Sequence, residues 1–142
     1  MKIAFIGLAG LGTTCLTKLI QSGYKIAIAI TEPTTDNRIL TDEYRYAENI
    51  RKKTLLEYIK YNTIIEICRF NGIPCYYPQN LSFDIETIES LRRAGADTLV
   101  VCTYNHKLSN QIIDMFKFAI NVHPGILPEY AGPSPIIYSL LN

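Results

Sequence analysis

The 142-residue sequence lacks an excess of charge of either sign, because 14 lysines and arginines stand against 13 aspartates and glutamates. Proteins that bind phosphate backbones present a strongly basic field. The balance therefore argues against nucleic acid as the partner and favours a small molecule. The chain also lacks an uninterrupted apolar run of the roughly 18 residues that a membrane span needs, so we expect no membrane partner.

Cysteine is present but not in the spacing of a metal or redox site, since the sequence has no Cys-x-x-Cys pair. Apolar neighbours surround all four cysteines, which are Cys15, Cys68, Cys75 and Cys102. That pattern is typical of reduced, buried thiols in a cytosolic protein. We therefore expect a cytoplasmic location and no metal. Glycines interrupt the apolar N-terminal run, which argues against a signal peptide.

Short apolar runs alternate with segments of helical spacing along the chain. Strands are expected at residues 2–7, 25–31, 74–77, 97–104 and 118–122, and helices at residues 11–21, 84–94, 109–116 and 133–141. Residues 47–71 are too long for one ordinary helix, and a capping box from Thr63 to Glu66 starts a second helix there. Residues 32–46 are expected to form a long loop. This alternation predicts one α/β domain with a doubly wound, mostly parallel sheet, as in Rossmann-like folds.

Ligands of such sheets bind outside the carboxyl ends of the strands. Three stretches of this sequence follow expected strands: residues 7–14, residues 104–108 and residues 121–132. His106 draws interest only because it follows a core strand directly. The convergence of these stretches on one edge predicts a site there.

The first stretch, "GLAGLGTT", is rich in glycine and opens a helix. Free N–H groups at a helix start suit a phosphate, but a plain strand-to-helix turn fits the residues equally well. The spacing Gly-x-x-Gly-x-Gly also differs from the Gly-x-Gly-x-x-Gly of dinucleotide-binding proteins. Glu32 is the nearest acidic residue to serve as a ribose ligand, so the signal for NAD is weak.

The third stretch contains Asn121 and His123. Alternate side chains of a strand share a face, so the Asn amide and the imidazole are expected to point the same way. Together they would make a donor pair for the negative charge that develops in acyl transfer. From the residues alone, catalysis and a structural Asn–His pair are equally open.

At this point the sequence resembles a known family. "NVHPGILPEYAG" is similar to the signature of the folate-dependent formyltransferases, which runs Asn, aliphatic, His, any residue, Ser or Gly, aliphatic, Leu, Pro, any residue, aromatic, any residue, Gly. Every defined position is filled, by Asn121, Val122, His123, Gly125, Ile126, Leu127, Pro128, Tyr130 and Gly132. The family's N-terminal domain is also similar along the rest of the chain. Its members act on methionyl-tRNA, glycinamide ribonucleotide or nucleotide-carried amino sugars.

The resemblance implies an N-formyltransferase whose donor is 10-formyltetrahydrofolate and whose acceptor is a primary amine. Asn121 and His123 would hold the oxyanion of the tetrahedral intermediate, and one such donor is worth about 10²–10³ in rate. The pterin would lie against Tyr104, Asn105, His106, Leu108 and Leu127. The acceptor's phosphate would meet Gly10, Gly12, Thr13 and Thr14.

The same resemblance implies that a catalytic residue is missing, since the family uses an Asp downstream of the motif for proton transfer. The sequence ends before that position, and Glu129 is a poor substitute because the family varies there. An apolar helix at residues 133–141 would also be left uncovered. We therefore expect the domain to be truncated at its C-terminus, and the exposed apolar surface to favour self-association.

The expected acceptor is a phosphorylated or nucleotide-linked amine, in particular an amino sugar. The near-neutral charge argues against tRNA, and the phosphate-friendly turn and the long loop at residues 32–46 suit a phosphorylated or nucleotide-bearing acceptor. Three alternatives stay open: a hydrolase that releases formate from the folate, a non-catalytic folate- or nucleotide-binding module, and an NAD-dependent Rossmann protein. The misplaced glycines weigh against the last of these.

Overall fold

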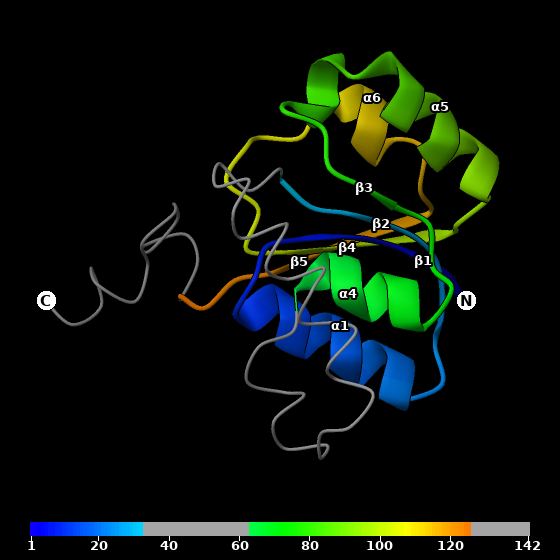
Figure 1. Cartoon of the computed structure of the whole chain (residues 1–142). Helices are drawn as coiled ribbons and strands as arrows, with labels where there is room; N and C mark the ends of the chain where they lie inside the picture. Colours follow the sequence, from blue (N-terminus) through cyan, green and yellow to red (C-terminus); the bar gives the residue numbers. More distant parts are fainter. Residues whose placement is uncertain (33–62, 126–142) are drawn as a thin grey trace, which may run out of the picture.

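The computed structural model describes residues 1–32 and 63–125 of the chain (Figure 1). Its sheet has five strands in the order β3-β2-β1-β4-β5, and every neighbouring pair is parallel. The strands are β1 (Lys2–Gly7), β2 (Lys25–Ile30), β3 (Cys75–Tyr76), β4 (Thr98–Cys102) and β5 (Phe118–Val122). The expected α/β fold with a parallel sheet is confirmed.

Helices cover both faces of this sheet, as the doubly wound pattern predicts. They are α1 (Leu11–Gln21), α4 (Ile64–Phe70), α5 (Ile85–Ala94) and α6 (Asn110–Ile113), and a 3-10 turn, η1, spans Leu81–Phe83. In Figure 1, α1 and α4 lie below the sheet, while α5 and α6 lie above it. The four helices therefore form two layers around the central sheet.

The core is divided into the same two layers, because β1 sends alternate side chains to opposite faces. Ile3 and Phe5 pack with Leu16 of α1 and with Ile64 of α4. Ala4 and Ile6 form the other cluster, which includes Leu81, Leu91 and Ile112 from η1, α5 and α6. A central strand buried on both faces explains why "KIAFIG" reads as a continuous apolar run.

Local hydrogen bonds and one glycine form the helix ends that the sequence predicts for α4 and α5. Thr63 and Glu66 form the capping box, with Glu66 N–H donating to Thr63 Oγ1 at 3.2 Å and Thr63 N–H donating to Glu66 Oε2 at 3.1 Å. Asp84 caps α5 by accepting from Thr87 N–H at 2.8 Å. Gly95 ends the same helix in the left-handed conformation, at φ 59°.

Other boundaries differ from the expectation. α6 covers four residues where eight were expected, and Ser109 stands at its N-cap without a side-chain hydrogen bond. The backbone tightens after it, because the N–H groups of Met115 and Phe116 bond three residues back instead of four. This tightening returns Phe116 to the core. Most of the loop expected at 32–46, the first part of 47–71 and the helix at 133–141 lie outside the described residues.

The four cysteines carry free thiols, as expected. Cys68 and Cys102 are buried, whereas Cys15 and Cys75 are only half-buried, so the expectation of burial holds for two of them. Burial raises the pKa of the Cys102 thiol to about 11, with a further contribution from Cys15 beside it. In the described part of the chain, no helix is long and apolar enough to cross a membrane.

We expect Thr63→Ala to lower the free energy of unfolding by about 1 kcal/mol, because the Glu66 N–H loses its acceptor at the start of α4. Urea unfolding followed by circular dichroism would measure this change. Ser90→Ala, inside α5, is the matched control and should be close to neutral. Equal effects of the two variants would contradict a capping role for Thr63.

Candidate active site

The strand order reverses between β1 and β4. From β1 the chain moves outward to β2 and β3, whereas β4 lies on the other side of β1 and leads to β5. In open α/β sheets the ligand lies outside the carboxyl ends of the strands at such a switch point. The residues after β1 and β4 are therefore the first place to look for a site, and β5 ends beside them.

Glycine allows the ends of β1 and β4 to meet closely. A Cβ atom added at Gly7 would lie 2.8 Å from the carbonyl oxygen of Cys102, and one added at Gly12 would lie 3.3 Å from the same oxygen. Leu8 N–H donates to this carbonyl at 3.3 Å. The glycine-rich turn is therefore seated directly on the end of β4, which accounts for its glycines without a ligand.

Gly10 is the N-cap of α1, at φ 84°. The hydroxyls of Thr13 and Thr14 both donate to its carbonyl oxygen, at 2.7 Å and 3.2 Å. No side chain caps this helix end and no acidic residue lies in its first turn. Backbone N–H groups are thus the donors that this turn can offer to an anion, and the expected phosphate contact of Gly10, Gly12, Thr13 and Thr14 remains a prediction.

Thr103, the first residue after β4, has a backbone conformation that is unusual for its type. Its φ of 56° is the only positive value for a non-glycine residue in the described ranges. A β-branched residue in that region is strained by about 1–3 kcal/mol, and such strain concentrates at functional sites. The Thr103 hydroxyl donates to the Cys102 carbonyl at 2.6 Å. Residue type carries no signal for this conformation, so sequence reasoning missed it.

Residues 104–108 leave the sheet immediately after this turn. Tyr104 and Leu108 pack against the core cluster on the α5–α6 face, while Asn105 and His106 are exposed. The rings of Tyr104 and His106 meet edge to face, with centroids 5.6 Å apart. Four of the five residues expected to bind the donor thus lie in one loop. The inner side of this loop is apolar, and its outer side is polar.

The Tyr104 phenol sits in a protected environment. Burial raises its pKa, the negative charge of Glu32 adds to the rise, and a hydrogen bond with the Leu81 backbone opposes it. Glu32, which follows β2, also accepts a 3.4 Å hydrogen bond from Asn105 Nδ2. Its carboxylate therefore faces the loop of residues 104–108, which follows β4. The sequence pattern had suggested Glu32 only as a ribose ligand.

β5 brings the Asn-x-His motif to the same edge. Asn121 stands opposite Val101 in the register, and Val122 stands opposite Cys102. Paired residues of neighbouring strands share a face, so Asn121 belongs to the face on which Val101, Tyr104 and Leu108 pack. Asn121 is exposed, and His123 follows one residue after the strand and is half-buried.

The first two expected stretches and residues 121–125 of the third thus meet at one edge of the sheet, because β1, β4 and β5 are adjacent and parallel. The common direction of the Asn121 and His123 side chains stays a prediction. Leu127 and Glu129 lie outside the described residues. Across the described residues no three His, Cys, Asp or Glu side chains gather as a metal site. The donors at this edge are amide, imidazole, hydroxyl and backbone groups, which suit a developing anion.

A parallel sheet with this switch point defines a Rossmann-like α/β domain, and comparison with known proteins makes the class narrower. The family model described as formyl transferase matches residues 1–142. The chain therefore belongs to the formyl transferase family.

Three relatives, each called methionyl-tRNA formyltransferase, illustrate the similarity. The protein of Streptococcus uberis is 32% identical over 142 residues, which cover 99% of this chain and 40% of the relative. Those of Clostridium acetobutylicum and Agathobacter rectalis are 30% and 28% identical over 143 residues, which cover all of this chain and 41% of each relative. The chain thus spans about two fifths of the length of the curated relatives it matches.

The strain at Thr103 predicts a reversal of the usual preference for alanine over glycine. Thr103→Gly and Thr103→Ala both lose the hydroxyl, but only glycine adopts a positive φ without strain. We expect the glycine variant to be the more stable by about 1 kcal/mol in urea unfolding. At Ser90, inside α5, the alanine variant should instead be the more stable. A preference for alanine at both positions would show that Thr103 is not strained.

The pKa of Tyr104 predicts a loss of stability in alkali. The pKa is raised in the folded state, so its contribution to stability is fully present below the ordinary tyrosine pKa of 10.0 and is lost as the pH rises through the folded value. We expect the free energy of unfolding of the wild type to fall more steeply above pH 10 than that of Tyr104→Phe. Parallel curves between pH 9 and pH 11 (an interval that spans the ordinary tyrosine value of ~10) would contradict this.

Proposed function

We propose that the chain binds 10-formyltetrahydrofolate and takes part in transferring its formyl group to a primary amine. One observation carries the proposal: the motif of Asn121 and His123 stands at the end of β5, beside the loop of residues 104–108 that follows β4. The formyl transferase family matches the chain that carries this motif over residues 1–142. The folate would lie against residues 104–108 and Leu127. The half-buried Tyr104 and Leu108 offer an apolar surface to the pterin, with exposed polar groups beside it.

In this reaction the amine nitrogen bonds to the formyl carbon, and an electron pair of the carbonyl moves to its oxygen. Asn121 and His123 donate hydrogen bonds to that oxyanion, which stabilises the intermediate. When the intermediate collapses, the oxyanion re-forms the carbonyl and the bond to the folate nitrogen breaks. The attacking amine gives up one proton, and the departing folate nitrogen takes one up. The family pattern assigns this proton to an Asp downstream of the motif, and the proposal assigns donor binding and oxyanion stabilisation to the residues named above.

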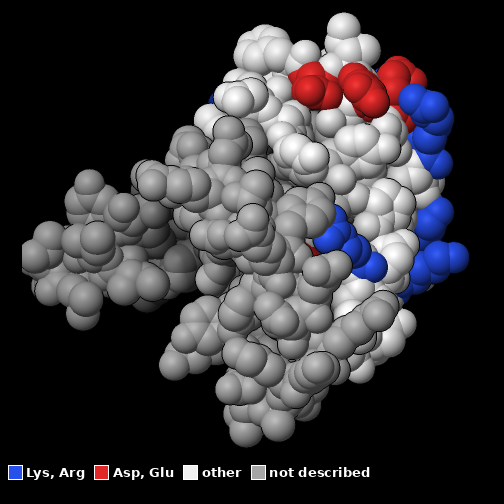
Figure 2. Space-filling model, viewed as in Figure 1, with Lys and Arg blue, Asp and Glu red and all other residues white. Residues whose placement is uncertain are grey.

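The acceptor is the finer part of the proposal. The sequence favoured a nucleotide-linked amino sugar, but the relatives reported above carry the name of methionyl-tRNA formyltransferase, which favours methionyl-tRNA. In Figure 2, most of the visible lysines and arginines of the described residues lie on the right, the side on which the strands of Figure 1 begin. Both acceptors present a primary amine near phosphate, so assays should offer both.

We expect Asn121→Ala and His123→Ala each to lower the rate of formyl transfer by about 10²–10³, because each removes one donor to the oxyanion. Binding of the donor should change little, since the oxyanion exists only after attack. The measurement is tetrahydrofolate release with methionyl-tRNA and with a nucleotide-linked amino sugar, beside equilibrium binding of 5-formyltetrahydrofolate.

Asn110→Ala is the matched control, since it removes an exposed amide from α6. Formate release without any amine would favour the hydrolase alternative. Folate binding without turnover would favour the non-catalytic module. A wild-type chain that does not bind the folate would overturn the proposal.

A further inference from the structure

The carboxylate of Glu32 joins two parts of the candidate site that the sheet keeps apart. Glu32 stands two residues after β2, and the loop of residues 104–108 follows β4. β1 lies between these strands, so no backbone pairing links their ends. The Glu32 side chain crosses the switch point and makes the connection.

Glu32 contacts two consecutive loop residues. Asn105 Nδ2 donates to Glu32 Oε2 at 3.4 Å. His106 Nε2 lies 3.4 Å from Glu32 Oε1, within reach of an ion pair when the imidazole is protonated. One side chain therefore contacts two of the residues proposed to bind the donor, and its charge also acts on the neighbouring Tyr104 phenol.

The Glu32 carboxylate is also more buried than is usual for a charged group at the surface. Its side chain is 22% exposed, and Oε1 is shielded from solvent without accepting a hydrogen bond among the described contacts. A buried, incompletely bonded carboxylate oxygen costs free energy. Exposed ion pairs return little of it, since their median contribution is about 0–1 kcal/mol. Stability alone therefore gives no reason for an acidic residue at this position.

Fixing the conformation of residues 104–108 would give a reason for the acidic residue at position 32. A binding loop that is fixed before the ligand arrives spares the entropy of ordering its side chains at binding. Asn105 and His106 are exposed, and apart from the edge-to-face contact of His106 with Tyr104 their side chains are held by Glu32. Glu32 engages both on the side facing β2, away from the β5 end that carries Asn121.

We propose that Glu32 is a positioning residue that holds the loop of residues 104–108 in the conformation that binds the folate donor. This inference rests on the proposed function. Glu32 acts through Asn105 and His106 and has no contact of its own with the reacting atoms. Its role predicts an effect on donor affinity that depends on those two side chains.

The test is equilibrium binding of 5-formyltetrahydrofolate to the whole chain and its variants. Glu32→Ala should weaken binding about tenfold, since it releases two side chains that must then be ordered when the folate binds. Glu32→Gln keeps an acceptor for Asn105 but loses the charge beside His106, so a smaller loss is expected. The melting temperature should change little in either variant, because the cost of burying the incompletely bonded Oε1 offsets what the 3.4 Å pair with His106 contributes.

A double-mutant cycle separates positioning from a general structural effect. If Glu32 acts through His106, Glu32→Ala should weaken binding less in a His106→Ala background than in the wild type. Purely structural damage would instead add to the loss caused by His106→Ala. Additive losses would therefore overturn the inference.

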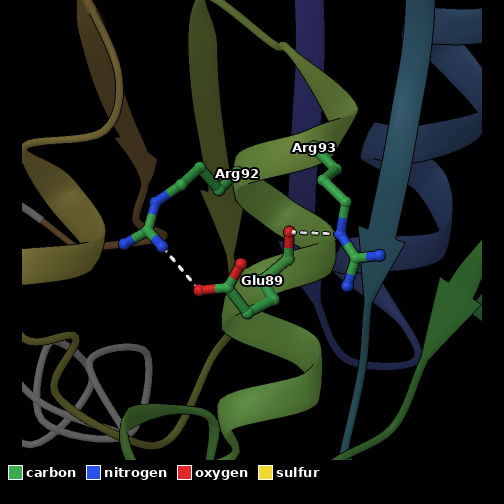
Figure 3. A network of polar contacts seen from close by, with 3 residues as sticks. All are labelled: Glu89, Arg92 and Arg93. Atoms are coloured by element: carbon green, nitrogen blue, oxygen red, sulfur yellow. Dashed lines mark hydrogen bonds and ion pairs between the residues drawn. The ribbon is translucent and has the colours of Figure 1, made fainter.

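Glu89 provides the matched control (Figure 3). Its carboxylate pairs with Arg92 at 2.6 Å on the exposed side of α5, and its backbone oxygen accepts from Arg93 Nε at 3.3 Å. Glu89→Gln removes the same charge and should leave folate affinity unchanged. If the wild type binds the folate and Glu32→Ala binds it equally well, the inference fails alone. If the wild type does not bind, the inference and the proposed function fail together.

Discussion

The close approach of β1 to β4 is the constraint on which the candidate site depends. Gly7 permits it, because any side chain there would meet the Cys102 carbonyl oxygen at 2.8 Å. That carbonyl accepts from both the Leu8 N–H and the Thr103 hydroxyl, so it fixes the turn after β1 and the turn after β4 at once. With both turns fixed, the start of α1 and the loop of residues 104–108 diverge from one point. The space between them is where the fold admits a ligand.

The two faces of the sheet carry different groups at this edge. Asn121, Tyr104 and Leu108 belong to the α5–α6 face, whereas Leu16 of α1 and the helix α4 close the other face. Residues 104–108 and Asn121 thus lie on one side of the edge, and the glycine-rich turn opens from the other side. Under the proposed function, the donor and the acceptor would approach from these two sides.

Sequence reasoning located β1 because a strand buried on both faces leaves a continuous apolar run. It also placed β5 at its expected bounds, although this edge strand is mostly exposed. It located the ends of α4 and α5 because Thr63, Asp84 and Gly95 act through local bonds. It overestimated α6, whose tightening follows from Phe116 returning to the core, a tertiary effect. Thr103 and the contacts of Glu32 were also missed. The strain depends on a neighbouring turn, and the contacts join residues 73 positions apart, so neither has a local pattern.

The same division explains why this edge of the sheet identifies a reaction more readily than an acceptor. In the proposed reaction, Asn121 and His123 would meet the charge on the formyl oxygen, which develops in the same way whichever amine attacks. At the start of α1, Thr13 and Thr14 have donated their hydroxyl hydrogens to Gly10, so the backbone N–H groups remain for an anion. Backbone N–H groups recognise phosphate as such and do not distinguish a sugar nucleotide from a tRNA end. Discrimination between acceptors must therefore come from surfaces that touch the rest of the acceptor, away from the switch point between β1 and β4.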